Sequence, residues 1–362
     1  GPDMNLVRKR PRVLALIAIT LYVFAALSVS DVQSLATPAE DAGACPPSLR
    51  PPLPPSSEGS GDAPTFTVLQ GNLWMLPARP LLLPFPFSTD RRFRLERFLR
   101  TMRACRPTVV LLQEVFERPM VRLLARHLPD YRVLTSGETD VTGILNASGL
   151  VTLTRLPVRG TAFHPFPRLP KGTKVIEALA RKGVLATDVV APGVEGTILH
   201  LHLYASRDSV EARVTWSQLE EVLALARELE AEGRQLLVAG DFNLPREELD
   251  RFLPDRWTIS RHGPTFDARV NPYTIQGSNN TPIRHEERRL GTGVRTIDLL
   301  LSSPAAGVKV RSRVLESFFI SDHQFLQHTV LAEGEGPRKA EGKRPRKAEG
   351  EGARLEEGSG SL

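Results

Sequence analysis

Acidic, amide and imidazole side chains recur in this sequence at the ends of apolar runs that are typical of strands. They are Asn72, Glu114, His202, Asp241, Asn243, Asp298, Asp322 and His323. The ends of packed strands are rigid supports from which such side chains can converge at one edge of a sheet. A single pair such as Asp322 and His323 is more often a solvated turn, and Glu114 or Asp298 alone could belong to an ion pair. So many polar residues in equivalent positions favour a shared site.

The chemistry that suits this set is hydrolysis assisted by a metal ion. Carboxylate and amide oxygens, without cysteine or paired histidine ligands, favour a hard cation such as Mg²⁺, for which Mn²⁺ or Co²⁺ could substitute. His202 and His323 could supply an acid and a base. Phosphoester hydrolysis needs a metal to neutralise phosphate charge, a base to deprotonate water and a hydrogen-bond donor opposite. The sequence therefore predicts a hydrolytic metal site.

The elements that would position these residues lie between residues 65 and 333. Nine short runs rich in leucine and β-branched residues are bounded by Gly, Pro or Asn, from FTVLQGNLW at residue 66 to HQFLQHTVLA at residue 323. Apolar residues recur at helical spacing from Leu95 to Met102 and from Trp216 to Ala226. Few of the strands are separated by helices, so mixed β-sheets flanked by helices are favoured over a purely parallel sheet.

Composition indicates a globular chain with a sizeable core. Of 362 residues, 41% are hydrophobic and 24% are charged, which fits one large α/β domain with tails as well as two domains. The two cysteines, Cys45 and Cys105, lie in regions of different character, so neither a disulfide framework nor a structural zinc site is indicated. The net charge of +6 is uneven; it is weak evidence for nucleic-acid binding but suits an anionic membrane surface.

The N-terminal region predicts export. In residues 1–12, Gly1 to Asp3 read as a tag remnant and are followed by a basic stretch. Residues 13–30 are expected to be a transmembrane anchor or a signal peptide. The apolar run in residues 13–29 would reach about 26 Å as a helix, slightly less than a hydrocarbon core of ~30 Å. Both alternatives send the rest of the chain across the membrane, so we expect a membrane-anchored or secreted catalytic domain outside the cytoplasm.

Two further segments flank the expected domain. Residues 31–64 are rich in Pro, Ser, Ala and Gly and read as a linker, because they cannot bury enough apolar surface to fold. Residues 334–362 repeat PRKAEG within a run of Glu, Gly, Lys and Arg, and we expect them to form a disordered charged tail. The metal-dependent phosphodiesterase domain is therefore expected to cover residues 65–333.

Six motifs give the sequence a resemblance to a known family. QGNLW, LLQEVF, LHLHL, VAGDFN, TIDLLL and ISDHQ, in that order, resemble the endonuclease/exonuclease/phosphatase (DNase I-like) superfamily. The resemblance covers nearly all of residues 65–333 and implies a four-layer α/β sandwich, with two mixed β-sheets flanked by helices. It also implies that Glu114 is the principal Mg²⁺ ligand, with Asn72 close to it.

The same resemblance implies roles for the other strand-end residues. His323 would be the general base, oriented by Asp298 or a neighbouring acid. His202 would lie opposite, across the phosphate, as a proton donor or transition-state stabiliser. Asp241 and Asn243 would hold water, phosphate and metal in register.

Further stretches resemble the neutral sphingomyelinases within that superfamily. They are NASGLVTLTRLPV, ARKGVLATDV and HGPTFDARVNPYT. In that family a lysine follows an aspartate after four residues and the two form a switch. Here Lys182 follows Glu177 at this spacing, so Lys182 is expected either to act in such a switch or to bind phosphate. His200 stands where relatives usually have an asparagine.

These observations predict a phosphoric diester hydrolase that cleaves a sphingomyelin-like phospholipid into ceramide and a phospho-headgroup. The apolar, proline-broken loops at residues 75–88 and 163–172 suit contact with a bilayer. The expected partner is a membrane phospholipid, with an anionic lipid as a further candidate. Few basic residues besides Arg155, Lys174 and Lys182 lie near the strand ends, which argues against nucleic acid. An endonuclease of the same superfamily and a non-catalytic membrane-tethered module are the alternatives, and the oligomeric state is not indicated.

Overall fold

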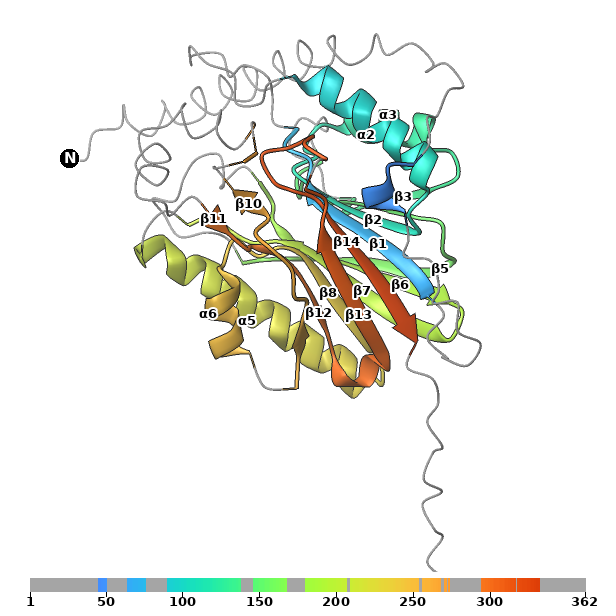
Figure 1. Cartoon of the computed structure of the whole chain (residues 1–362). Helices are drawn as coiled ribbons and strands as arrows, with labels where there is room; N and C mark the ends of the chain where they lie inside the picture. Colours follow the sequence, from blue (N-terminus) through green and yellow to red (C-terminus); the bar gives the residue numbers. More distant parts are fainter. Residues whose placement is uncertain are drawn as a thin grey trace, which may run out of the picture.

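Two β-sheets packed face to face between two layers of helices form the domain, as Figure 1 shows for this computed structural model. The structure describes residues 45–50, 64–75, 90–137, 146–167, 180–206, 209–253, 256–267, 270–271, 273, 294–316 and 318–332. The predicted four-layer α/β sandwich is confirmed, and so are its mixed sheets.

The first sheet has six strands in the order β13-β14-β1-β2-β4-β3. They are β1 (Pro64–Asn72), β2 (Val109–Gln113), β3 (Arg132–Thr135), β4 (Val151–Thr154), β13 (Val308–Val314) and β14 (Leu326–Ala332). The central strand β1 runs parallel to β2 and antiparallel to β14. Because β1 and β2 are parallel, their carboxyl ends lie at the same edge of the sheet.

The second sheet has six strands in the order β5-β6-β7-β8-β12-β9. They are β5 (Val158–Pro165), β6 (Gly183–Ala191), β7 (Val194–His202), β8 (Gln235–Asp241), β9 (Thr258–Ile259) and β12 (Asp298–Ser302). Strands β7 and β8 are parallel, whereas β12 is antiparallel to β8. A separate two-stranded ribbon joins β10 (Phe266–Asp267) to β11 (Val294–Arg295).

Helices cover the outer faces of both sheets (Figure 1). Helices α2 (Arg91–Cys105) and α3 (Arg118–His127) lie on the side of the first sheet, and α5 (Ser209–Ala231) and α6 (Arg246–Phe252) on the side of the second. Short 3₁₀ helices span η1 (Pro47–Leu49) and η2 (Pro304–Ala306).

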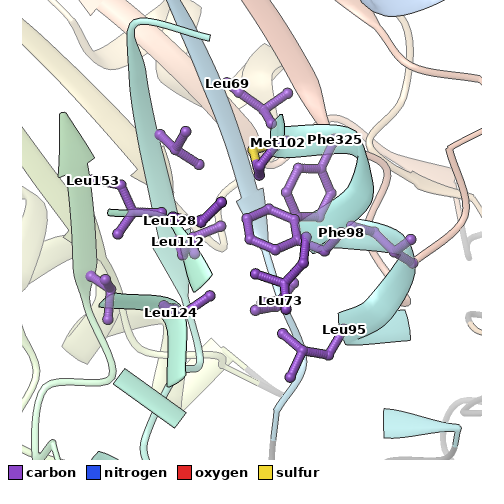
Figure 2. Packing of buried hydrophobic residues seen from close by; sticks show 14 of the residues in the cluster. Leu69, Leu73, Leu95, Phe98, Met102, Leu112, Leu124, Leu128, Leu153 and Phe325 are labelled. Carbon is purple, nitrogen blue, oxygen red and sulfur yellow. The ribbon is translucent and has the colours of Figure 1, made fainter. Parts of the chain in front are cut away.

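Three apolar clusters fill the three spaces between the four layers. One joins α2 and α3 to the first sheet, and Figure 2 shows Met102 and Phe98 of α2 near Leu69 and Phe325, with Leu95 farther along near Leu73. A second cluster joins α5 and α6 to the second sheet, and a third lies between the sheets. Burial of each leucine or phenylalanine contributes about 1.5–3 kcal/mol. The residues that recur at helical spacing in the sequence from Leu95 to Met102 are therefore those on the buried face of α2.

A disulfide bond links Cys45 and Cys105, although no disulfide framework was indicated by the sequence. It joins a proline-rich segment to the last residue of α2, across a sequence separation of 60. In the same segment Leu49 is buried, and its carbonyl oxygen accepts a hydrogen bond of 2.9 Å from Gln327 Nε2. Sequence composition misses this pairing because the contacts that hold residues 45–50 come from distant parts of the chain.

Several sequence predictions concern residues outside the described ranges. These are the apolar segment at 13–30, most of the linker at 31–64, the loop residues 76–88, Glu177 of the expected switch and the tail at 334–362. Within the described part of the chain, none of the helices has both the length and the apolar character needed to cross a membrane.

Candidate active site

The registers of the strands bring the predicted residues together at one edge of the sandwich. Asn72 ends β1 and is paired with Gln113, the last residue of the parallel strand β2. In the second sheet, His202 at the end of β7 is paired with Asp241 at the end of β8. Asp298 begins the antiparallel strand β12 directly opposite Asp241. Four of the predicted positions are thus placed by backbone pairing alone.

Sharp turns after these strands aim the polar side chains inward. Trp74, Glu114 and Asn243 have φ angles of 51°, 59° and 50°, in the left-handed region that non-glycine residues seldom adopt. Asn72 Oδ1 accepts a hydrogen bond of 2.9 Å from the Trp74 N–H, and Asp241 Oδ1 accepts one of 2.9 Å from the Asn243 N–H. In the turns after β1 and β8, the side-chain oxygen of the last strand residue therefore accepts a hydrogen bond from the backbone N–H two residues later. Strained backbone of this kind concentrates at functional sites.

Asn72 links the two sheets across the centre of the site. Its Nδ2 lies 2.9 Å from Glu114 Oε1 and 3.5 Å from Asp241 Oδ2. The amide therefore donates hydrogen bonds to carboxylates from both sheets. Its oxygen is engaged by the Trp74 N–H. The amide holds the two acids in place here, and direct ligation through its oxygen would require the side chain to turn.

Glu114 is a carboxylate whose two oxygens differ in their contacts among the described residues. Within the described residues, Glu114 Oε2 is buried and makes no hydrogen bond. Burial raises the pKa of Glu114, and the nearby Asp322 carboxylate raises it further. An uncompensated buried carboxylate is unfavourable by itself but is suited to a divalent cation with oxygen ligands. The residues therefore fit the predicted divalent metal.

His323 forms a close pair with Asp298. The His323 Nδ1 atom lies 2.8 Å from Asp298 Oδ2 and 3.8 Å from Asp241 Oδ2. Burial alone would lower the pKa of His323, but Asp298 and Asp241 outweigh it and raise that pKa well above its usual value. Burial, followed by the charge of Asp298, raises the pKa of Asp241 to about 7. His323 is thus oriented by Asp298, one of the acids considered from the sequence.

Asp322, the sequence neighbour of His323, makes a different contact. It is buried, and its Oδ1 accepts a hydrogen bond of 3.1 Å from Ser321 Oγ. Its charge acts on Glu114 by raising the pKa of that residue. The acid that is hydrogen-bonded to His323 is therefore Asp298, which comes from a distant part of the sequence.

A second group of possible metal ligands comprises Asp241, Asp298 and His323, whose ligand atoms lie within 4.8 Å of one another. Charge compensation distinguishes this group from Glu114. His323 Nδ1 faces both carboxylates and, when protonated, would neutralise part of their charge. Within the described residues, Glu114 Oε2 has no such neighbour in hydrogen-bonding contact. Glu114 is therefore the acid of the site whose charge is less compensated by the protein.

His202 and Lys182 face the site from the second sheet. Lys182 Nζ donates to the Leu203 carbonyl oxygen at 2.8 Å and lies 3.3 Å from His202 Nε2, which in turn lies 3.6 Å from Asp241 Oδ2. Burial, together with the charge of Lys182, lowers the pKa of His202 well below its usual value. His202 is therefore neutral near pH 7 and can act as a hydrogen-bond donor rather than as an imidazolium acid. Asn243 Nδ2 also binds the Leu203 carbonyl, at 3.0 Å.

Polar contacts between the sheets set their spacing just behind the site. Gln70 Nε2 donates to the Gly240 carbonyl oxygen at 2.9 Å. His200 lies 2.7 Å from Gln113 Nε2 through its Nε2 atom and 3.0 Å from Thr152 Oγ1 through Nδ1. Burial lowers the pKa of His200 to about 3, so its ring is neutral, accepts from Gln113 and donates to Thr152. The histidine that replaces an asparagine of similar proteins is thus a bridge between sheets.

Arg94 is a positioning residue that sequence reasoning missed. This fully buried side chain donates through Nη1 to the carbonyl oxygens of Leu73 and Ile320 at 2.9 and 2.8 Å, and through Nη2 to that of Trp74 at 2.9 Å. Its guanidinium lies 5.0 Å from the Trp74 ring centroid and 5.5 Å from that of Tyr273. The sequence feature that could have identified it is the position of this arginine on the apolar face of the predicted helix.

Two residues of the HGPTFDARVNPYT stretch hold the catalytic loop. Thr265 Oγ1 accepts a hydrogen bond of 3.2 Å from the Asp298 N–H. Asn271 Nδ2 donates to the carbonyl oxygens of Ser321 and Asp322 at 3.0 and 3.2 Å. These contacts fix the segments that carry Asp298 and His323. The stretch was noticed in the sequence only through its resemblance, and its positioning contacts were not foreseen.

Several solved structures share the fold of this chain. Sphingomyelinase C from Streptomyces griseocarneus is 16% identical, with a TM-score of 0.56 over 75% of this chain and 100% of that chain. A mutant beta toxin from Staphylococcus aureus with bound magnesium ions is 13% identical, with a TM-score of 0.56 over 73% and 99% of the two chains. TDP2 from C. elegans is 17% identical, with a TM-score of 0.53 over 74% and 75%. At these identities the likeness shows the fold alone.

No curated protein matches the chain in a sequence comparison. A model of the endonuclease/exonuclease/phosphatase family matches residues 69–323, which include every strand-end residue discussed above. Because this match covers more than half of the chain, the chain belongs to the endonuclease/exonuclease/phosphatase family, whose members use divalent metals in phosphoric diester hydrolysis.

Proposed function

We propose that this protein is a Mg²⁺-dependent phosphodiesterase that hydrolyses a sphingomyelin-like phospholipid to ceramide and a phospho-headgroup. The observation that carries the proposal is the pairing of His323 with Asp298 at 2.8 Å, beside Glu114, whose buried Oε2 atom makes no hydrogen bond within the described residues. This arrangement offers a proton acceptor on one side and a cation site on the other.

In the proposed reaction, water attacks phosphorus while the bond to the ceramide oxygen breaks. The neutral form of His323 takes a proton from the attacking water at Nε2, while its Nδ1–H donates to Asp298 and so holds the ring in place. The leaving ceramide oxygen takes the bonding electron pair and then a proton from solvent. No covalent enzyme intermediate forms. A bound Mg²⁺ would supply charge neutralisation of the phosphodiester.

The residues opposite His323 would stabilise the charge that develops on phosphate. His202, neutral and buried, can donate a hydrogen bond to a phosphate oxygen, and Lys182 contributes a positive charge 3.3 Å from it. Asn243 and Asp241 would hold water and phosphate in register through their shared turn. Asn72 would keep Glu114 and Asp241 at a fixed separation.

A lipid substrate is supported by three independent observations. Two of the similar structures, sphingomyelinase C and beta toxin, are matched over almost their whole length. The sequence carries an apolar N-terminal segment at residues 13–29 and an apolar loop at residues 75–88. The disulfide between Cys45 and Cys105 suits an oxidising compartment outside the cytoplasm. We therefore propose a tethered or secreted enzyme that acts at a membrane surface.

The test offers the purified full chain three substrates separately, with Mg²⁺ or with EDTA. They are sphingomyelin vesicles, glycerophospholipid vesicles and plasmid DNA. The proposal predicts metal-dependent release of phosphocholine from sphingomyelin and intact DNA. The His323→Ala variant is the control for a contaminating hydrolase. Nicked plasmid with intact sphingomyelin would show that the enzyme is an endonuclease and would refute the lipid assignment.

A further inference from the structure

The two outer layers of helices carry opposite charge. The sequences of α2 and α3 contain nine arginines and one acidic residue, Glu96. Those of α5 and α6 contain eight acidic residues and four arginines. Because these layers lie on opposite sides of the sandwich (Figure 1), the domain has a basic face and an acidic face. We call the first of these, formed by α2 and α3, the basic layer.

Part of this positive charge is exposed on the surface of the basic layer. Two arginines of α2 are buried: Arg91 pairs with Glu117 at 3.0 Å, and Arg94 binds the loops of the site. By contrast, Arg100, Arg122 and Arg126 are exposed. On α3 the arginines recur every fourth residue and therefore share one face of the helix, where like charges repel. Such an arrangement is unfavourable for folding and suits an anionic partner.

The disulfide bond shows which end of the basic layer is near the chain's apolar N-terminal segment. Cys45 is bonded to Cys105, the last residue of α2. Only residues 30–44 separate Cys45 from the apolar run at 13–29, and fifteen residues span at most about 50 Å. If that run lies in a membrane, as proposed above, the basic layer is held within this distance of the bilayer.

The other end of the basic layer lies at the active-site edge. Arg94, near the start of α2, contacts the carbonyl oxygens of Leu73 and Trp74, which follow the catalytic residue Asn72. Phe93 is exposed on the same turn, with 52% of its surface accessible. Arginines interspersed with an exposed aromatic residue are typical of surfaces that bind the headgroup region of a bilayer. The layer thus reaches from the tether to the site.

We propose that the basic layer is a docking surface for an anionic lipid bilayer. The acidic face formed by α5 and α6 would be repelled by the same bilayer, so the charges specify one orientation. Docking would bring the active-site edge alongside the headgroups. The proposal rests on the membrane tether of the proposed function but does not depend on which phosphodiester is cleaved.

The test measures how fast individual arginines react with a dicarbonyl reagent, read by mass spectrometry, in the full chain inserted into nanodiscs. Discs of phosphatidylcholine are compared with discs that also contain phosphatidylglycerol; neither contains sphingomyelin. We expect Arg100, Arg122 and Arg126 to react about five-fold more slowly in the anionic discs, with the difference removed by high salt. Arg213 and Arg227 are exposed on α5 and serve as internal controls whose rates should not change.

Matched variants separate local charge from a general effect on binding. Arg100→Gln combined with Arg122→Gln should abolish the protection of Arg126, whereas Arg213→Gln with Arg227→Gln should preserve it. Equal rates in neutral and anionic discs would overturn the proposal. Protection by duplex DNA in neutral discs, without protection by anionic lipid, would also overturn it and assign the layer to nucleic acid. Because the discs lack sphingomyelin, this result is separate from the test of hydrolysis.

Discussion

Removal of the Cys45–Cys105 disulfide should destabilise the domain by an amount that follows from its place in the chain. The bond closes a loop with a sequence separation of 60. In the chain-entropy treatment, a loop of this length restricts the unfolded state by about 4 kcal/mol. For a domain of this size, that loss corresponds to a fall in melting temperature of about 8 °C. Release of residues 45–50 would also expose Leu49, which is 3% accessible in the fold.

The measurement is thermal unfolding, followed by circular dichroism, for the wild-type chain and for Cys45→Ser with Cys105→Ser. Each protein is melted with and without a reductant. We expect the reductant to lower the melting temperature of the wild type to that of the double variant and to leave the variant unchanged. A wild-type melting temperature that does not change with the reductant, or a double variant as stable as the wild type, would refute the reasoning. Either result would also argue against the covalent link between the tether and the basic layer.

Three further predictions follow from the contacts described above. Asp298→Asn should lower kcat by about 10²–10⁴-fold, because His323 loses the carboxylate that orients it, and steady-state kinetics with an unchanged circular dichroism spectrum would check this. Gly240→Ala should destabilise the fold by about 3 kcal/mol or more, since an added Cβ would lie 1.9 Å from the Leu201 carbonyl oxygen; an unchanged denaturation midpoint would contradict that contact. Burial, aided by His262, lowers the pKa of His328 to about 3, below its value in the unfolded chain. The contribution of neutral His328 to folding stability is therefore fully present above pH 6.5 and is lost as the pH falls below that value. Between pH 7 and 5 the wild type should lose about 2 kcal/mol more stability than His328→Gln in urea titrations, and parallel losses would count against a neutral buried His328.

The strand-end residues could be predicted from the sequence because their positions follow from local patterns. Asn72, Glu114 and Asp241 each terminate an apolar run; backbone register aligns the strand ends within each sheet, and packing of the sheets brings the ends together. The helical spacing from Leu95 to Met102 likewise identified the buried face of α2. Such features depend on the period of one element and not on its partners.

Other features depend on partners that are distant in the sequence. Asp298 orients His323, although Asp322 is adjacent to it, because β12 lies opposite β8 and directs Asp298 into the site. His323 was expected to open the last strand, whereas β14 begins at Leu326 and His323 lies in the preceding loop. The disulfide and the role of Arg94 were missed for the same reason, since neither can be inferred before the packing of α2 is known.

The central claim is that the strand-end residues form a metal-dependent hydrolytic centre with Glu114 as the principal ligand. It is tested most directly by measuring the initial rate of sphingomyelin hydrolysis as a function of Mg²⁺ concentration for the wild type and for Glu114→Gln. Glutamine keeps the shape of the side chain but removes the negative charge of the carboxylate, whose Oε2 atom makes no hydrogen bond within the described residues. We expect the wild-type rate to rise with Mg²⁺ to a plateau and the variant to show almost no metal-dependent rate. A variant that keeps the wild-type Mg²⁺ dependence and turnover would contradict the account.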